Sequence, residues 1–496
     1  MTAVPVAAPA VQFNPESRLY IDGELRESTS GATVDNVNPA TEEILGVATD
    51  ASGEDMEKAI AAARRAFDTT DWATNRDFRQ HCLRQLHEAV QKDKENFRAE
   101  LVAEAGAPLS STYIAQLDWP AADAIRWPAE FISEFQWERP LPQDAKLGIP
   151  YNRVVVKEPV GVIAAITPWN FPFEIISNKL SQILATGNTV VLKPAMETPW
   201  GALRWGRLIA QETDIPAGVV NIVPATDLEV SSRLLADPRV DMVSFTGSTM
   251  VGELIREKSA KTMKRTLLEL GGKSAYIVLD DADMSVALPG CMGALIHSGQ
   301  GCALATRVLV PRSHYEQAVE VATATFGAVG CGDPADPVNF CGPLVSAKQR
   351  GRVMEYIEIG KSEGARLTTG GAAPKGLDRG YFVAPTVFAD VTPDMRIFQE
   401  EIFGPVITIT PYDGDDEAVE LANATTYGLA GAVHGSNDRA MAVARRLRTG
   451  AVMINSGMYY GADAPFGGYK MSGVGRQNGL EGFETYTETK TIAYSD

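Results

Sequence analysis

The stretch that decides the fold is RVVVKEPVGVIAAITP, residues 153–168, which predicts a strand, a turn and a strand. A helix over NKLSQILATG, residues 178–187, and a strand over NTVVLKPA, residues 188–195, follow it. Strands that alternate with helices of roughly ten residues predict βαβ units in a parallel sheet. The continuous apolar runs VGVIAAI and TVVL favour strands that are covered on both faces.

The alternation continues toward the C-terminus. Helices are expected over 202–212 and 229–237, with strands over 218–224 and 240–247. A second alternating segment starts after residue 271, with strands expected over 274–279, 307–311 and 407–412. The sequence therefore predicts an α/β protein with two parallel-sheet domains.

The part before residue 153 is mainly helical in pattern. LYIDGEL, residues 19–25, predicts a hairpin with an Asp-Gly turn, and helices are expected over 53–68, 76–105 and 109–135. The last helix carries Trp119, Trp127, Phe131 and Phe135. Two interpretations of this aromatic series are open, helix packing and the wall of a substrate tunnel.

Length and charge exclude several classes of protein. The 496 residues allow two or three domains, and 45 basic against 63 acidic side chains give a net charge of −18. Such an acidic chain argues against nucleic-acid binding, which depends on neutralising phosphates with basic side chains. No run of 18 apolar residues is present, so no membrane span is expected.

The five cysteines form no CxxC pair, which argues against a zinc site and a disulfide framework. Reduced thiols suit a cytoplasmic protein, and we expect no bound metal. The apolar N-terminus lacks a basic residue before Arg18 and contains two prolines, so residues 1–16 are expected to be a disordered arm and not a secretory signal.

Three local motifs can carry chemistry. The strand–glycine–helix pattern at FTGST, residues 245–249, suits a pyrophosphate, although it also fits an ordinary turn with Ser248 as the helix N-cap. Cys302 lies in a turn opened by Gly299 and Gly301, where a substrate could approach the sulfur; the alternative is a small buried thiol. Glu269 follows an apolar strand, where partial desolvation would raise its pKa and favour a general base over a fixed counter-ion; the alternative is a surface carboxylate at a strand end.

Taken together, these motifs resemble the NAD(P)-dependent aldehyde dehydrogenase superfamily. The resemblance extends from about residue 17 to residue 496 and rests on eight motifs in the family's order, which are TPWNFP (167–172), VVLKPA (190–195), FTGS (245–248), LELGGK (268–273), GQGC (299–302), EEIFGPV (400–406), PFGGYKMSGVGR (465–476) and YTETK (486–490). Each motif is weak alone, but eight in register are very specific. A relative that keeps the fold without turnover is the alternative; it would be expected to lose Cys302, Glu269 or Asn170, and all three are present.

The resemblance implies a mechanism. The Cys302 thiolate would attack the aldehyde carbon, and the Asn170 amide with the Cys302 backbone N–H would hold the oxyanion. Hydride transfer to the nicotinamide would leave a thioester, which water activated by Glu269 would hydrolyse to a carboxylic acid. The residue after Arg476, often a glutamate that relays protons, is Gln477 here, so the proton would leave through water or through Lys179.

The resemblance also implies the cofactor contacts. Lys193 matches the lysine at the adenosine ribose, Ser248 with Gly247 a pyrophosphate contact, and Glu401 with Phe403 the nicotinamide-ribose contacts. Thr167, Trp169 and Thr246 are expected to line the same cleft. The family's ribose-binding glutamate is replaced by Met196, with Glu197 one place later, so NADP is plausible beside NAD.

Substrate choice is expected to depend on a mainly apolar tunnel. Its expected lining is Phe171, Ile175, Asn178, Gly301, Ala303, Met458, Tyr460 and Phe466, with Trp119 or Trp127. This composition predicts an uncharged, medium-sized or aromatic aldehyde, and disfavours phosphorylated and dicarboxylic aldehydes.

The resemblance divides the chain into three parts. A Rossmann-like cofactor domain is expected from 17–138 and 160–270, and a catalytic domain from 271–472. A bridging segment, 139–159 with 473–496, would extend a neighbour's sheet in a homodimer or homotetramer.

Overall fold

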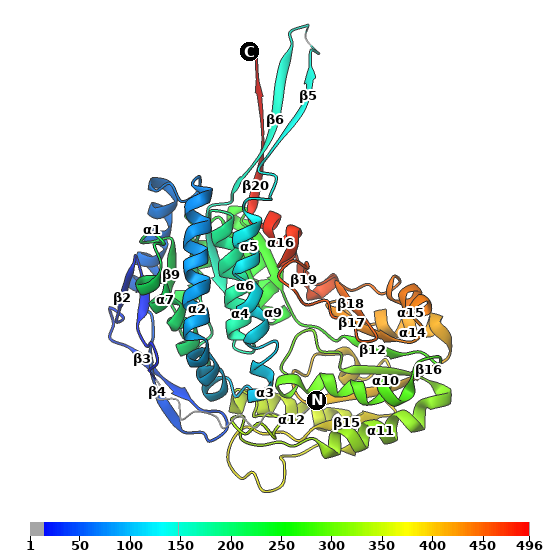
Figure 1. Ribbon diagram of the computed structural model, residues 1–496. Coiled ribbons are helices and arrows are strands. Elements are labelled where there is room, and N and C mark those ends of the chain that lie inside the picture. The colour runs from blue at the N-terminus through cyan, green and yellow to red at the C-terminus, as the bar shows by residue number, and fades with distance from the viewer. Residues whose placement is uncertain (1–13, 147, 496) are drawn as a thin grey trace.

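The structure is a computed structural model that describes residues 14–146 and 148–495. Two helix-covered sheets form the body, and a narrow arm of three strands projects from it (Figure 1). This confirms the α/β class with two sheets built mainly of parallel strands. Within the described residues, no helix combines the length and the low polarity that crossing a bilayer requires.

The larger sheet has eight strands in the order β19-β11-β10-β7-β8-β9-β1-β2. Their bounds are β1 Leu19–Ile21, β2 Glu24–Arg26, β7 Val162–Ile166, β8 Thr189–Lys193, β9 Val220–Ile222, β10 Met242–Thr246, β11 Arg265–Glu269 and β19 Gly473–Val474. The five central strands are parallel, and β19, β1 and β2 pair antiparallel at the edges. The expected hairpin at 19–25 is β1–β2, with Asp22 and Gly23 in the left-handed region that its turn requires.

Helices cover both faces of this sheet (Figure 1). On one face lie α2 Arg76–Glu104, α6 Pro172–Ala185 and α7 Pro199–Glu212, and on the other lie α1 Gly53–Thr69, α8 Leu228–Ala236 and α9 Thr249–Ser259. The strands between them are fully buried, as the apolar runs predict.

The chain order of the parallel strands creates a switch point. From β7 the chain moves outward through β8 and β9 and then returns to β10 and β11 on the other side of β7. Helices therefore leave β7 and β10 in opposite directions and open a crevice at the carboxyl ends of these strands, which is where ligands of open α/β sheets bind.

The second sheet has seven strands in the order β14-β15-β16-β13-β12-β17-β18. Their bounds are β12 Ala275–Val278, β13 Arg307–Pro311, β14 Arg366–Thr369, β15 Thr386–Ala389, β16 Val406–Tyr412, β17 Ala430–His434 and β18 Ala451–Ile454. One face packs on α12 Ala347–Ser362, α13 Arg396–Gln399, α14 Gly414–Asn423 and α15 Asn437–Ala444, and the other on α10 Met284–Gly290 and α11 Tyr315–Ala328.

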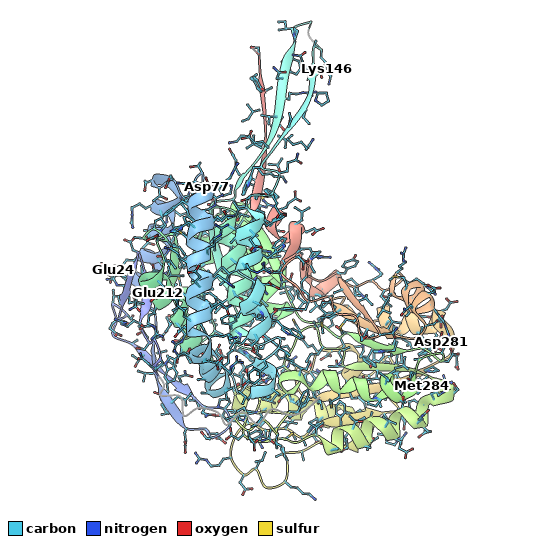
Figure 2. The ribbon with its side chains drawn as sticks, in the orientation of Figure 1. Glu24, Asp77, Lys146, Glu212, Asp281 and Met284 are labelled. Carbon is cyan, nitrogen blue, oxygen red and sulfur yellow. The ribbon has the colours of Figure 1, made fainter. Side chains whose placement is uncertain are left out.

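The arm consists of β5 Glu138–Asp144, β6 Tyr151–Pro159 and β20 Thr487–Tyr494. Lys146 lies near its tip, far from the body (Figure 2). The bridging segment is shorter than expected at its C-terminal end. Residues 473–474 form β19 in the large sheet, α16 Gly479–Thr485 contacts α6, and only β20 pairs in the arm. That the arm extends the sheet of a second copy stays a prediction.

The single helix expected over 109–135 is wrong. The structure has three short helices, α3 Leu109–Thr112, α4 Asp118–Asp123 and α5 Arg126–Phe131. Pro120 and Pro128 stand in the first turns of α4 and α5, where a missing N–H is tolerated but continuous helical bonding is not.

The aromatic series divides between its two interpretations. Phe131 and Phe135 pack on Phe483 of α16, and Trp127 stacks on Phe131. Trp119 instead contacts Tyr460, with ring centroids 5.8 Å apart, at a cavity.

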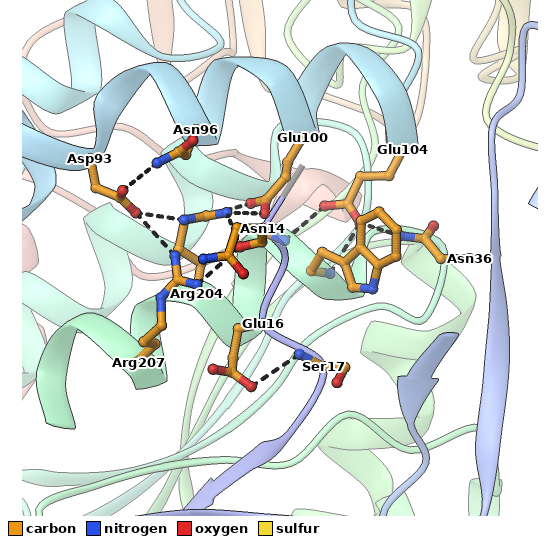
Figure 3. A network of polar contacts seen from close by, with 12 residues as sticks. Asn14, Glu16, Ser17, Asn36, Asp93, Asn96, Glu100, Glu104, Arg204 and Arg207 are labelled. Carbon is orange, nitrogen blue, oxygen red and sulfur yellow. Dashed lines mark hydrogen bonds and ion pairs between the residues drawn. The ribbon is translucent and has the colours of Figure 1, made fainter. Parts of the chain in front are cut away.

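A buried polar network joins α2 to α7 (Figure 3). Arg204 of α7 pairs with Glu100 and Asp93, and Glu104 accepts the N–H groups of Trp200 and Gly201 at the start of α7. A carboxylate at a helix N-terminus is stabilised by the orphan N–H groups there.

The N-terminal segment joins this network. Arg204 and Arg207 donate to the Asn14 carbonyl, and the buried Glu16 pairs with Arg18. Of the disordered arm expected over 1–16, residues 1–13 lie outside the described part. Asn14 and Glu16 are hydrogen-bonded and Glu16 is buried, so the prediction is wrong for these residues.

The remaining elements are short. A separate two-stranded sheet pairs β3 Thr33–Val37 with β4 Ile44–Thr49, and 3-10 turns occur at η1 Ala260–Thr262, η2 Cys291–Gly299, η3 Arg312–His314 and η4 Lys470–Ser472. Of these, η2 leads to Cys302 and positions the site.

Candidate active site

The carboxyl ends of four neighbouring strands bring predicted site residues into one row. Glu269 ends β11 and pairs with Thr246 at the end of β10. On the other side of the switch point, Ile166 pairs with Lys193, and the next residue, Thr167, donates its N–H to the Lys193 carbonyl at 3.2 Å. The crevice of the large sheet is therefore lined by a carboxylate, two hydroxyls and an ammonium group.

Some groups of the turn between β10 and α9 could bind an anion, and others are already hydrogen-bonded. Ser248 is the N-cap of α9 and is exposed at the positive end of this helix. The Gly247 N–H is not free, because it donates to the Glu269 carbonyl at 3.0 Å. A Cβ at position 247 would lie 2.3 Å from the Phe245 ring, so packing requires the glycine. Both interpretations of this motif, helix cap and anion site, fit the same geometry.

Cys302 follows a turn that only glycines permit. Gly299 has φ +75°, and a Cβ there would lie 2.0 Å from the Gly404 carbonyl oxygen. A Cβ on Gly272 would lie 2.3 Å from the Cys302 carbonyl oxygen. Burial raises the pKa of the Cys302 thiol, and the nearby carboxylates of Glu401, Glu174 and Glu269 raise it further.

Asn170 is buried beside this turn, and both its side-chain amide and its backbone carbonyl are hydrogen-bonded. Its Nδ2 donates to the Gln300 carbonyl at 2.9 Å, and its own carbonyl accepts from Gln116 Nε2 at 2.8 Å. A side-chain amide has two N–H donors, so one remains for a substrate oxygen.

Glu269 is a buried carboxyl without a hydrogen-bond partner in the described residues. Neither carboxyl oxygen has a donor, and the side chain is shielded from bulk solvent. Burial raises the pKa of Glu269 to about 8, against the charges of Lys179 and Arg476, which lower it. An unpaired buried carboxyl costs stability, so its presence here indicates a functional reason.

Lys179 joins a chain of hydrogen bonds that leads away from Glu269. Its Nζ donates to Ser244 Oγ at 2.9 Å, Ser244 Oγ lies 2.8 Å from the Tyr486 hydroxyl, and Tyr486 donates to Gln477 Oε1 at 3.4 Å. Burial lowers the pKa of Lys179 to about 8, which Glu269 opposes. Sequence reasoning gave no role to Ser244 or Tyr486. Ser244 lies within β10 and Tyr486 follows α16, and only the fold brings them together.

One cavity of about 160 Å³ brings the four predicted catalytic residues together. Its lining includes Asn170, Lys179, Glu269 and Cys302, together with the predicted substrate residues Phe171, Ile175, Tyr460 and Phe466. Met458 is not part of this lining. It is 61% exposed and lines an adjoining cavity with Trp119 and Asp123, because the loop that carries it turns outward.

Glu174 is an acidic residue of this cavity that sequence reasoning missed, as it also missed Tyr459. It stands one helical turn before Asn178 on α6 and contacts the Tyr460 hydroxyl and, at 3.5 Å, Asn178 Nδ2. Burial raises the pKa of Glu174 to about 8, against the Tyr460 hydrogen bond. In the sequence it is one of several polar residues of α6, and nothing in the pattern marks it as a tunnel position.

Glu401 and Phe403 lie on the opposite side of the nucleophile turn. Glu401 Oε1 accepts the Gly272 N–H at 2.8 Å, and burial raises the pKa of Glu401 to about 7. Phe403 has φ +62° and packs edge-on against Trp169, with ring centroids 5.5 Å apart. The two sheets thus meet around Cys302.

Comparison with known proteins agrees with this geometry. The model of the "Aldehyde dehydrogenase family" matches residues 25–492. The chain belongs to this family. A 3-succinoylsemialdehyde-pyridine dehydrogenase of Pseudomonas sp is 41% identical over 480 residues, which cover 95% of this chain and 97% of that one.

Two solved aldehyde dehydrogenase structures are also similar. Betaine aldehyde dehydrogenase of Staphylococcus aureus, in complex with NAD+, has a TM-score of 0.93 and 35% identity, over 97% of this chain and 95% of that one. A cysteine-to-alanine mutant of aldehyde dehydrogenase C of Pseudomonas syringae, with NAD+ and octanal, has a TM-score of 0.90 and 38% identity, over 96% of both chains.

Proposed function

We propose that this family member oxidises an aldehyde to a carboxylic acid with NAD, through a thioester on Cys302. The observation that carries this proposal is the shared cavity, in which the thiol, the spare Asn170 donor and the unpartnered Glu269 carboxyl all line one space. A nucleophile, an oxyanion donor and a base are the groups that acyl chemistry requires. A relative without turnover would have no need of an unpaired buried carboxyl.

The chain's own residues perform four tasks. The Cys302 thiol gives its proton to solvent water, and Sγ as the thiolate bonds to the aldehyde carbon, while Asn170 Nδ2–H and the Cys302 N–H stabilise the oxygen. The bound dinucleotide supplies the acceptor for the hydride that the carbon loses. Glu269 then takes a proton from water, which attacks the thioester, breaks the C–S bond and releases the acid. The charge of Lys179 favours the deprotonated form of Glu269 and so opposes the burial that raises its pKa.

The residues of the crevice fit a dinucleotide. Thr167 Oγ1 is buried without a partner in the described residues, and Ser248 leaves the α9 N-terminus accessible. We infer that these groups bind it with Lys193, Thr246 and Gly247, while Trp169, Glu401 and Phe403 contact its nicotinamide end. NAD is expected over NADP, because the charge of Glu197 still acts on Lys193 and would repel a 2′-phosphate. The check is a comparison of kcat/KM for the two cofactors.

The tunnel composition supports an uncharged, medium-sized or aromatic aldehyde. The cavity around Cys302 is mainly apolar and aromatic, and its entrance carries Trp119 and Met458. Asp123 at the entrance would repel a carboxylate or a phosphate, and Glu174 inside would do so once the pH exceeds its raised pKa of about 8. The similar proteins support this choice, since one structure contains octanal and another relative is named for a pyridine semialdehyde.

An aldehyde with a cationic tail is the second candidate. Glu174 could pair with a cation, and the aromatic rings of Tyr460 and Phe466 line the same cavity. The similar betaine aldehyde dehydrogenase makes this class worth testing.

Replacing Glu174 by Gln separates the two candidates. If uncharged aldehydes are the substrates, kcat/KM for octanal and benzaldehyde should change less than about threefold, because no charge pairs with Glu174. If a cation is preferred, kcat/KM for betaine aldehyde should fall at least tenfold, about 1.4 kcal/mol. The matched control is Asp123→Asn at the entrance, which keeps the inner carboxyl.

Replacing Asn170 by Ala is expected to lower kcat by roughly 10²–10³-fold, the usual effect of removing one oxyanion donor. Gln116, whose side-chain amide donates to the Asn170 carbonyl and not to its side chain, provides the control, and Gln116→Ala should cost much less. Steady-state kinetics at saturating NAD measure both. A kcat for Asn170→Ala within threefold of wild type would contradict the oxyanion role.

Replacing Lys179 by Met is expected to shift the pH profile of thioester hydrolysis. Glu269 acts as a base only when deprotonated, so hydrolysis should rise with pH up to about 8 and then level off. The Lys179 charge lowers the pKa of Glu269, so its loss should move the rising limb to higher pH. Presteady-state rates between pH 6 and 10 measure this limb. An unchanged limb, or a shift to lower pH, would contradict the coupling.

We further infer that the large sheet is the core of a cofactor domain (17–138 and 160–270) and the second sheet that of a catalytic domain (271–472). The arm would join a homodimer or homotetramer. Light scattering of the purified chain tests the assembly.

A further inference from the structure

Two cysteines outside the active site lie side by side. Cys331 follows α11, and Cys341 closes the loop that begins there, with the two residues paired in an isolated β-bridge. Backbones paired in this way are about 4.8 Å apart. This spacing lies inside the range of roughly 4.4–6.8 Å between Cα atoms that a disulfide permits. The Cys341 thiol donates to the Leu295 carbonyl at 4.0 Å, and the two thiols influence each other's pKa.

The loop holds the pair in place. The Cys341 N–H donates to the Gly330 carbonyl at 3.1 Å, and the Gly332 N–H donates to the Cys341 carbonyl at 3.1 Å. Bond formation therefore requires side-chain rotation and little backbone movement.

The two thiols differ in access and in acidity. Cys331 is half-buried, whereas Cys341 is fully buried. The interaction with the Cys341 thiol lowers the pKa of Cys331, while the same interaction and burial raise the pKa of Cys341. An accessible thiol of lowered pKa beside a second thiol is the arrangement found where reversible oxidation occurs.

Cys302 is half-buried like Cys331 but differs from it in acidity. Burial and three nearby carboxylates raise the pKa of its thiol and so disfavour its thiolate. Cys82 and Cys291 are buried in the two cores, where burial raises the pKa of each thiol. Cys331 is therefore the thiol that an oxidant should meet first.

The pair lies against the segment that positions the nucleophile. The Gly342 carbonyl, next to Cys341, accepts from Ser298 Oγ at 2.7 Å, and the Val345 N–H donates to Gln300 Oε1 at 2.9 Å. The Gln300 carbonyl in turn accepts from Asn170. A disulfide at Cys341 would thus form next to residues that are hydrogen-bonded to the turn before Cys302.

We propose that Cys331 and Cys341 form a modification site that a hydroperoxide converts to a reversible intrachain disulfide. Cys331 is first oxidised to a sulfenic acid, and the peroxide is reduced, in the case of H₂O₂ to one water. The Cys341 sulfur then bonds to Cys331 and displaces a second water. The two thiols lose two electrons in total, and a dithiol reductant restores them.

The test uses the full chain with Cys302→Ala, so that the readout does not depend on aldehyde oxidation. After one equivalent of H₂O₂, alkylation of remaining thiols and mass spectrometry should show a linked peptide pair containing residues 331 and 341. Two thiols should disappear per chain, and dithiothreitol should restore both. If no disulfide forms, the proposed function is not affected, because the tested variant lacks the Cys302 thiol.

Single replacements provide the controls. Cys331→Ser should prevent oxidation at this site, whereas Cys341→Ser should leave a sulfenic acid on residue 331 that dimedone traps. Thermal melting confirms that each variant is folded. Oxidation of Cys82 or Cys291 before Cys331, or conversion of Cys331 to sulfinic acid without a link to Cys341, would overturn the proposal.

Discussion

Replacing Cys302 by Ala is expected to abolish NAD-dependent aldehyde oxidation, with kcat reduced by at least about 10⁴-fold, as for other enzymes that lose their nucleophile. The reason is geometric. Among the side chains that line the cavity, Cys302 carries the one thiol, and it shares this space with the spare Asn170 donor and Glu269. The measurement is NADH formation at 340 nm with octanal and with benzaldehyde.

Cys331→Ser is the matched control for this experiment. It removes one thiol, as Cys302→Ala does, but at a half-buried position outside the cavity. It should keep kcat within about twofold under reducing conditions. Equal losses in both variants would indicate a general loss of structure, and substantial turnover by Cys302→Ala would contradict the role of the thiol.

Replacing Glu269 by Gln is the second large effect. Gln keeps the size of the side chain but cannot take a proton, so the thioester should form and then persist. We expect a burst of about one NADH per active site, followed by a steady rate lowered roughly 10²–10⁴-fold, the usual contribution of a general base. Stopped-flow absorbance measures the burst, and mass spectrometry should find the acyl group on Cys302.

The same substitution, which lowers the rate of turnover, is expected to raise the stability of the fold. A buried carboxyl without a partner in the described residues is unfavourable in its charged form. The pKa of Glu269, raised by burial, means that folding opposes ionisation, so this residue reduces stability increasingly as pH rises through its unfolded-state pKa toward about 8. Glu269→Gln should therefore unfold at higher temperature than wild type at pH 8, and the difference should shrink at pH 4. A Tm below that of wild type at pH 8 would indicate an unrecognised partner.

Much of the fold could be predicted from local patterns. The apolar runs at 162–166 and 189–193 are strands, and Glu269 ends an apolar strand as expected. The aromatic segment could not be predicted as well, because Pro120 and Pro128 are compatible with a helix start as well as with a break. Length and periodicity alone favoured one long helix there.

In the active site, too, some residues could be predicted from the sequence and others could not. Cys302, Glu269 and Asn170 stand in motifs whose order along the chain is specific, and the structure places all three in one cavity. Glu174 stands in no such motif, and its position in the tunnel depends on which face of α6 meets Tyr460. Single polar residues of this kind acquire a role only through packing between segments far apart in the sequence.

The position of Met458 at the entrance could not be predicted for a related reason. Its neighbour Tyr460 turns into the catalytic cavity, whereas Met458 remains mostly exposed at the entrance. The direction of a side chain in an irregular loop depends on backbone angles that composition does not reveal.

The central claim is that aldehyde oxidation proceeds through an acyl group on Cys302. The most direct measurement mixes Glu269→Gln enzyme with octanal and NAD and determines the mass of the intact chain within the first turnover. The account predicts an added octanoyl group, located on Cys302 and formed together with one equivalent of NADH. NADH formation without an acyl adduct, or an adduct on another residue, would contradict it.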